Sequence, residues 1–137
     1  MKILVTGASG FLGTNLIQKL KRDSSLKILK FNRNDSFHVL EDHINNADFI
    51  FHLAGTNKGS EEDLFSGNEE LTQKICNIYN NLQKEVPIIY SSTRHADSDS
   101  LYGKSKLNTE KILKKSIPNI NLRIYRLSNL FGKWCKP

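Results

Sequence analysis

The chain has 137 residues, and its 38% hydrophobic and 25% charged residues are typical of one globular domain with a substantial core. No apolar run approaches the ~18 residues of a membrane-spanning helix and the N-terminus lacks a signal-peptide pattern, so we expect a cytoplasmic protein with no membrane partner. The net charge of +6 comes from scattered lysines without the aromatic-rich strands of RNA-binding domains, so we expect no nucleic-acid partner.

Short apolar strands alternate with amphipathic helices along the whole chain. The spacing predicts strands at residues 2–6, 26–31, 48–53, 86–91 and 121–127, and helices at 11–21, 37–44, 61–84 and 100–115. Gly67 weakens the long helix locally, and Pro87 is expected at a strand start. This alternation predicts an α/β fold, a Rossmann-type doubly wound parallel sheet in three layers with about five strands. No repeat or linker divides residues 1–137, which we interpret as one domain.

The stretch TGASGFLG, residues 6–13, follows the first strand and opens the first helix. Glycine is needed where φ is positive or where the backbone must approach a ligand closely, and the N–H groups at a helix start attract phosphate. This context predicts a pyrophosphate-binding loop, with a purely structural tight turn as the alternative. The cofactor-binding residues predicted in the loop are Thr6, Gly7, Ser9, Gly10, Phe11, Leu12 and Gly13.

The choice between NAD and NADP is read at the end of the second strand. An acidic residue there would bind the ribose 2′-OH of NAD, but no carboxylate occurs before Asp35. Arg33, beside Asn32, could form charge-assisted hydrogen bonds to a 2′-phosphate. We therefore expect NADP(H) to be favoured over NAD(H), with a solvated loop arginine as the alternative.

Tyr102 and Lys106 are four residues apart and share one face of a predicted helix. A nearby ammonium favours tyrosinate and lowers the pKa of the tyrosine, so the phenol can exchange a proton near neutral pH. Ser92 and Thr93 end the fourth strand, at the edge where open parallel sheets bind their ligands. The combination predicts a proton-transfer site.

Cysteine and histidine are not placed for metal binding. The two cysteines are far apart, without a CxxC pair, and the four histidines lack metal-ligand spacing. We expect reduced thiols and no metal.

These motifs together resemble the short-chain dehydrogenase/reductase superfamily. The resemblance implies that Tyr102 protonates a carbonyl oxygen during hydride transfer and that Ser92 or Thr93 polarises this carbonyl. It also implies that Lys106 lowers the tyrosine pKa and binds the nicotinamide ribose.

Two further stretches are similar to motifs of this superfamily. FHLAG resembles the segment that lines the adenine and ribose, which implies cofactor contacts for Leu53, Ala54 and Gly55. His52 fits a packed strand-end residue better than a catalyst. Asn68 matches an asparagine of the family's catalytic set, with an ordinary exposed polar residue as the alternative.

RLSNLFG, residues 126–132, resembles the extended, nucleotide-sugar-modifying branch known as the NAD-dependent epimerase/dehydratase family. In that branch the asparagine matching Asn129 helps to hold the substrate's diphosphate. With FHLAGTNK and YGKSKL, the tail at residues 129–137 is similar to bacterial capsular-polysaccharide reductases of UDP-N-acetyl-L-fucosamine synthesis. These reductases act on UDP-linked 4-keto-6-deoxy-N-acetylhexosamines, so the resemblance implies a UDP-sugar substrate.

Sister activities are disfavoured by two local departures. The family's 4,6-dehydratases carry Asp-Glu after the threonine, where this chain has Arg94 and His95. Its 4-epimerases commonly show an acidic residue after the second strand, where this chain has Asn32 and Arg33.

Family members continue past this length, with a substrate-binding lobe and, in the capsular group, a cupin-like domain. We therefore expect residues 1–137 to be an incomplete NAD(P)-binding Rossmann domain whose apolar faces favour association into a homo-oligomer. A non-catalytic dinucleotide-binding module stays open as an alternative. A nucleic-acid-binding domain would rest on the charge alone, and salt-sensitive DNA binding without dinucleotide binding would favour it.

Overall fold

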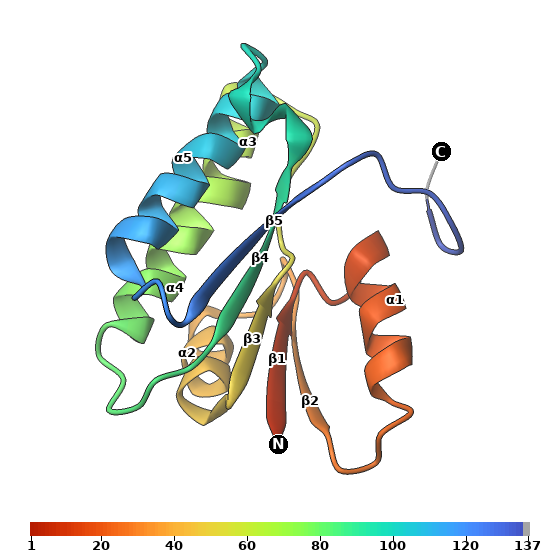
Figure 1. The fold of residues 1–137 in the computed structure, drawn as a ribbon, viewed down its shortest axis with the longest axis vertical. Helices are drawn as coiled ribbons and strands as arrows, with labels where there is room; N and C mark the ends of the chain where they lie inside the picture. Colours follow the sequence, from red (N-terminus) through yellow and green to blue (C-terminus); the bar gives the residue numbers. More distant parts are fainter. Residues whose placement is uncertain (136–137) are drawn as a thin grey trace.

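Five parallel strands form one sheet in the computed structural model, which describes residues 1–135. The strands are β1 (Lys2–Thr6), β2 (Lys27–Phe31), β3 (Phe49–His52), β4 (Ile88–Thr93) and β5 (Leu122–Leu127). Their spatial order is β2-β1-β3-β4-β5, so the winding of the chain reverses between β1 and β3 (Figure 1). Open α/β sheets bind ligands beyond the carboxyl ends of the strands at this kind of reversal.

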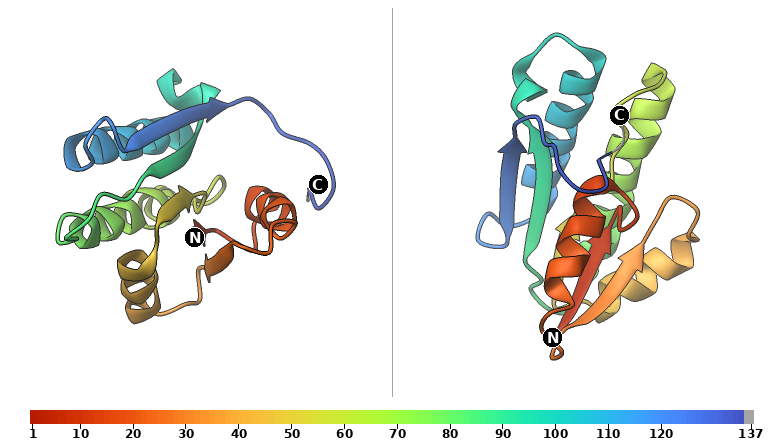
Figure 2. Two further views of the ribbon diagram at one scale, coloured as in Figure 1. Left: turned by 60° about the horizontal axis from the view of Figure 1, so that its bottom comes forward. Right: turned by 90° about the vertical axis from the view of Figure 1, so that its right-hand side faces the viewer.

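Helices cover both faces of the sheet, which confirms the predicted three-layer α/β fold. The helices are α1 (Phe11–Leu20), α2 (Phe37–Asn46), α3 (Glu61–Leu64), α4 (Leu71–Tyr79) and α5 (Leu101–Ser116), with a π-helix η1 (Phe65–Glu70) and a 3₁₀ helix η2 (Arg94–Asp97). Figures 1 and 2 show α1 on one face and α2, α4 and α5 on the other. None of the helices among residues 1–135 has the length and apolar character needed to cross a membrane.

The long helix predicted at residues 61–84 is broken and shorter than expected. It consists of α3, η1 and α4 in succession and ends at Tyr79, where two asparagines follow. Asparagine competes with the helix for backbone hydrogen bonds, which explains the early end. The π segment forms around Gly67, where any side chain would collide with the Thr56 hydroxyl. Single π turns inside helices are frequent at functional sites.

The two faces of the sheet carry cores of very different size. Under α2, α4 and α5 the fully buried side chains include Leu4, Ile50, Ile75, Ile88 and Leu113. Under α1 the buried cluster is limited to Ile3, Val5, Ala8 and Ile17. The larger core therefore holds β4 and α5, the two elements that carry the predicted proton-transfer residues.

Candidate active site

A cleft of about 1250 Å³ opens at the carboxyl ends of the strands and brings most of the predicted site residues together. Its lining includes Gly7, Ser9, Gly10, Phe11, Leu12, Gly13, Leu53, Gly55, Asn68, Ser92, Thr93, Tyr102, Lys106 and Asn129. A neighbouring cavity of about 540 Å³ takes in Asn32, Arg33 and Ala54 and shares several residues of the glycine loop. Thr6 borders neither space. The two cavities meet at the glycine loop, as a site for an elongated dinucleotide requires.

The glycine loop is shaped by close backbone packing. Gly7 has a φ of +66°, and a Cβ atom there would lie 2.8 Å from the Ala54 backbone, so only glycine fits without strain. The helix α1 follows with Gly10 as its N-cap, without a side-chain cap and without an acidic residue in its first turn. Its first N–H groups are therefore available to an anion, and the loop fits a pyrophosphate.

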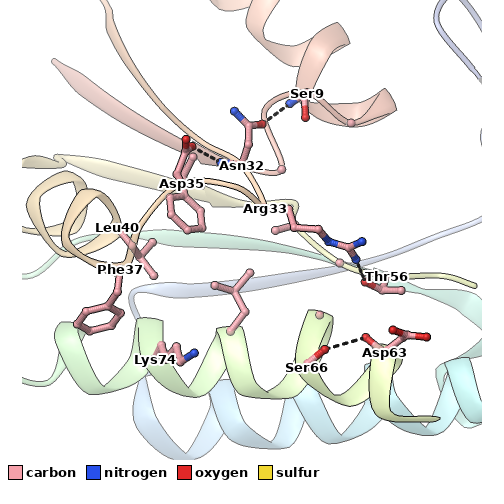
Figure 3. A pocket seen from close by; sticks show the side chains of 17 residues that line it. Ser9, Asn32, Arg33, Asp35, Phe37, Leu40, Thr56, Asp63, Ser66 and Lys74 are labelled. Carbon is pink, nitrogen blue, oxygen red and sulfur yellow. Dashed lines mark hydrogen bonds between the residues drawn. The ribbon is translucent and has the colours of Figure 1, made fainter. Parts of the chain in front are cut away.

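The cavity beside the end of β2, which we predicted to bind the adenosine end of the cofactor, is polar and open to solvent. Asn32 accepts a hydrogen bond from the Ser9 N–H (2.8 Å), which ties the end of β2 to the glycine loop. Arg33 reaches across the cavity and donates from Nη2 to the Thr56 hydroxyl (2.7 Å; Figure 3). The Asp35 carboxylate accepts a hydrogen bond from the Asn32 N–H (2.7 Å). The guanidinium of Arg33 thus stands over this cavity as a positive charge.

Thr6, which we predicted to contact the cofactor, bonds to other residues of the protein, and the contact stays a prediction. It is fully buried, and its hydroxyl accepts a hydrogen bond from the Ala54 N–H (3.1 Å) and contacts His52 Nδ1 (2.8 Å). On the other side of the ring, His52 Nε2 meets the Thr72 hydroxyl (2.9 Å). Burial, with a smaller effect of the Lys106 charge, lowers the pKa of His52 to about 3. The imidazole is therefore a neutral, packed group, as the sequence favoured.

Asn68 is buried in the π segment, so the alternative of an exposed polar residue is wrong. Its side chain is 1% exposed, and it pairs with both backbone groups of Thr56: Oδ1 accepts from N–H (3.0 Å) and Nδ2 donates to the carbonyl (2.9 Å). Nδ2 also donates to the Ser105 hydroxyl (3.2 Å). With these bonds Asn68 fixes the loop after β3 against α5.

Lys106 lies in the floor of the cleft and is only 4% exposed. Its Nζ donates to the Ser91 carbonyl (2.7 Å) and lies 4.3 Å from the centre of the Tyr90 ring. Burial lowers the pKa of Lys106 to about 7, and the Glu110 carboxylate opposes this effect. The contact with the aromatic face also favours the ammonium form.

Tyr102 does not show the lowered pKa that its spacing from Lys106 predicted. Burial raises the pKa of Tyr102 above its ordinary value, and a hydrogen bond with the Thr93 hydroxyl opposes this only in part. The reason is that the Lys106 ammonium is directed to the Ser91 carbonyl on β4. A phenol with a raised pKa keeps its proton at neutral pH and can act as an acid.

The structure distinguishes the two hydroxyls at the end of β4. Ser92 Oγ donates its proton to Glu110 Oε1 over 2.5 Å, so this proton is not available to a substrate. Thr93 Oγ1 accepts from the His95 N–H (3.2 Å) and contacts Tyr102. Of the two candidates, Thr93 is the one whose hydroxyl bonds to the phenol of Tyr102 instead of to a buried carboxylate.

Sequence reasoning missed Glu110, Arg126 and Tyr90. Glu110 follows Lys106 by four residues and shares its helix face, a spacing that could have revealed it.

The segment after β5 borders the cleft from the side of α1. It leaves the sheet and crosses to this helix, where Asn15 Nδ2 donates to the Lys133 carbonyl (3.0 Å; Figures 1 and 2). Asn129 thereby lines the same cleft as Tyr102 and Lys106. The last two residues of the tail motif, 136 and 137, lie outside the described residues. Within residues 1–135, no group of three or more histidine, cysteine or acidic side chains is placed to hold a metal ion.

Comparison with known proteins gives consistent matches along the chain. A UDP-2-acetamido-2,6-beta-L-arabino-hexul-4-ose reductase of Pseudomonas aeruginosa is 39% identical over 140 residues, covering 100% of this chain. A crystal structure of the capsular polysaccharide assembling protein CapF from Staphylococcus aureus superposes with a TM-score of 0.84 and 38% identity over 100% of this chain. The chain spans only 38% of the length of that reductase and 37% of that CapF chain.

A more distant match shows the fold alone. The UDP-glucuronic acid 4-epimerase of Bacillus cereus, solved with NAD, has a TM-score of 0.82 at 21% identity, over 96% of this chain and 58% of that one. The model of the NAD dependent epimerase/dehydratase family matches residues 3–137. The chain therefore belongs to the NAD dependent epimerase/dehydratase family.

Proposed function

We propose that residues 1–137 form the NAD(P)-binding domain of an NADPH-dependent reductase. Its substrate would be a UDP-linked 4-keto-6-deoxy-N-acetylhexosamine of the capsule or O-antigen pathway to UDP-N-acetyl-L-fucosamine. One observation carries the proposal: Tyr102, Thr93 and Lys106 line the same cleft as the glycine loop. The printed activity of the Pseudomonas aeruginosa relative, a reductase of a UDP-linked keto sugar, supports it.

The residues of the cleft fit a dinucleotide and divide the chemistry among them. When bound, NADPH supplies the hydride. Tyr102, whose raised pKa keeps the phenol protonated, donates a proton to the oxygen of the keto group. Thr93 donates a hydrogen bond to the same oxygen, and Lys106 supports the developing negative charge with its ammonium. Asn129 would contact the diphosphate of the substrate.

The preference for NADPH is supported by Arg33. Its guanidinium lies at the adenosine cavity, donates to the neutral Thr56 hydroxyl and interacts with the Asp63 carboxylate through its charge. From there it could form charge-assisted hydrogen bonds to a 2′-phosphate. Asp35, the first carboxylate after β2, accepts the Asn32 N–H and is thereby engaged. This arrangement favours an anionic ribose over the 2′-OH of NAD.

A dehydratase is disfavoured at the same place. A 4,6-dehydratase of this family needs an acid/base pair next to the threonine, but Arg94 and His95 begin η2 there. Asp97, the first carboxylate after Thr93, is hydrogen-bonded to Arg126 Nη1. Asp97 is therefore paired with Arg126 and does not supply the acid that a dehydratase needs.

Self-association and a cytoplasmic location remain part of this proposal. Among the described strands, β5 pairs with β4 alone, and Tyr125 on β5 is 53% exposed. The opposite edge strand, β2, carries the exposed Lys27 and Lys30, which discourage edge pairing. Light scattering of the purified protein would show whether it forms the expected homo-oligomer.

The test is a titration of the protein with NADPH, and with NADH as control, followed by nicotinamide fluorescence. Saturable binding that prefers NADPH is the expected result. Adding the UDP-linked 4-keto sugar should then consume NADPH in proportion to the sugar reduced. Absence of binding by either nucleotide would overturn the proposed function, and equal affinities would overturn the preference for NADPH.

A further inference from the structure

A buried carboxylate that does not line the cleft stands directly behind the proton-transfer residues. Glu110 on α5 is 1% exposed. Its Oε1 accepts from Ser92 Oγ (2.5 Å) and Arg126 Nε (2.9 Å), and its Oε2 accepts from Arg126 Nη2 (2.9 Å). A buried charge is costly to the fold unless it is paired in this way, and breaking such a pair leaves an uncompensated charge. Hydride transfer itself does not use this group, so its burial needs another explanation.

The carboxylate connects four elements around Thr93. Ser92 belongs to β4 and precedes Thr93, while Arg126 belongs to β5 and also binds Asp97 in η2 (2.5 Å). Thr93 therefore lies between two anchored neighbours. Ser92 before it is bonded to Glu110, and η2, which begins directly after it, is bonded to Arg126 through Asp97. Burial raises the pKa of Glu110, but the bonds from Arg126 and Ser92 outweigh burial and the net pKa lies below its ordinary value. Glu110 is thus an anion in the folded protein.

The same anion lies one helical turn from Lys106 on the same face of α5. The other titratable groups that face Lys106 are His52 on β3, Tyr90 on β4 and Tyr102 on α5. His52 is neutral because its pKa is about 3, and burial raises the pKa of both tyrosines. Glu110 is therefore the negative charge in this set, and it acts against the burial that lowers the pKa of Lys106 to about 7.

We propose that Glu110 is a positioning residue of this site: through Ser92 and Arg126 it fixes the carboxyl end of β4, and through its charge it holds Lys106 as an ammonium ion. Its importance for reduction rests on the proposed function. The effect of Glu110 on the charge of Lys106 does not depend on the proposed function, because this charge can be measured without cofactor or substrate.

The experiment follows the lysine side chains of the isotope-labelled protein by NMR as a function of pH, without ligands. Lys106 is assigned with Lys106→Met and should titrate far below the other lysines. In Glu110→Gln, which keeps size and polarity but removes the charge, the midpoint should fall by about one pH unit. In the matched control Glu110→Asp, which keeps the charge, it should stay within a few tenths of a pH unit of the wild type. An unchanged midpoint in Glu110→Gln overturns the proposal.

A second readout separates this role from a merely structural one. If Lys106 binds cofactor as an ammonium, Glu110→Gln should bind NADPH about fivefold more weakly at pH 7, and acidification should restore the affinity. A weakening that is equal at all pH values would contradict the charge role. If Glu110→Gln does not fold, the double variant Glu110→Gln/Arg126→Gln decides, because it leaves no uncompensated charge of the pair. The Lys106 midpoint should again fall, and an unchanged or raised midpoint overturns the proposal. If the Lys106 midpoint shifts as expected but the protein reduces no sugar, the proposed reductase function is contradicted and the role of Glu110 is not.

Discussion

The two ends of the cleft, which we propose bind the adenosine and transfer the proton, are built in opposite ways. At the adenosine end, Arg33 is exposed and its recorded hydrogen bond goes to a single neutral hydroxyl. At the proton-transfer end, Asn68, Lys106 and Glu110 are at most 4% exposed, and each is held by several hydrogen bonds or ring contacts. Exposed charges adapt to a ligand and contribute little to folding, whereas buried polar networks are rigid and costly to disturb. The open end is thus suited to selecting a cofactor, and the buried end to fixing the geometry of a reaction.

The comparison predicts its largest effect for Tyr102→Phe. Removing the phenolic proton should lower the rate of keto-sugar reduction by about 10²- to 10⁴-fold, because phenylalanine has no proton to give to the keto oxygen. NADPH affinity should change little, since the ring remains. Single-turnover oxidation of NADPH measures the first quantity and fluorescence titration the second. Turnover equal to that of the wild type would show that Tyr102 is not the proton donor.

Lys106→Met should stabilise the fold while abolishing function. The pKa of Lys106 is lower in the folded protein than in the unfolded chain, so charging it in the folded state costs free energy. This cost is fully present below about pH 7 and disappears as the pH approaches the ordinary lysine pKa. We expect the free energy of unfolding to rise by about 2 kcal/mol at pH 6, and by less at pH 9. Urea denaturation at both pH values checks the sign, and a gain that grows with pH would contradict it.

Arg33→Glu should weaken NADPH binding by about tenfold or more and NADH binding far less, because only NADPH carries the 2′-phosphate. Stability should be nearly unchanged, since the side chain is exposed. Parallel titrations with the two nucleotides decide the matter. Equal losses for both would mean that Arg33 does not read the phosphate.

The smallest effect is expected for Lys104→Ala, on the same helix as Lys106. Lys104 is exposed and faces Asp99 at 4.0 Å, a surface pair. Its removal should change the free energy of unfolding by less than about 0.5 kcal/mol and leave NADPH binding as it is. A larger loss of stability in thermal unfolding would show that the exposure of a side chain on this helix does not predict its contribution to stability.

Local signals made much of this molecule predictable. Strands, helices and the glycine loop follow from neighbouring residues, and the structure places Gly7 and Gly10 at the cleft as expected. The π segment was not predictable, because it depends on Asn68 meeting the Thr56 backbone from another element. The tyrosine pKa was predicted in the wrong direction, because spacing along a helix does not reveal that Lys106 donates to β4. Contacts between distant elements decide these features.

The unequal cores have a consequence for local opening of the protein. Only a small buried cluster anchors α1, whereas α5 packs into the main core. Segments with few buried apolar contacts open with a lower free energy, so the α1 amides should exchange with deuterium sooner than those of α5. A ligand that binds the start of α1 favours the closed state by mass action. Occupancy of the glycine loop should therefore be visible as slowed exchange along α1, which makes this helix an internal reporter of cofactor binding.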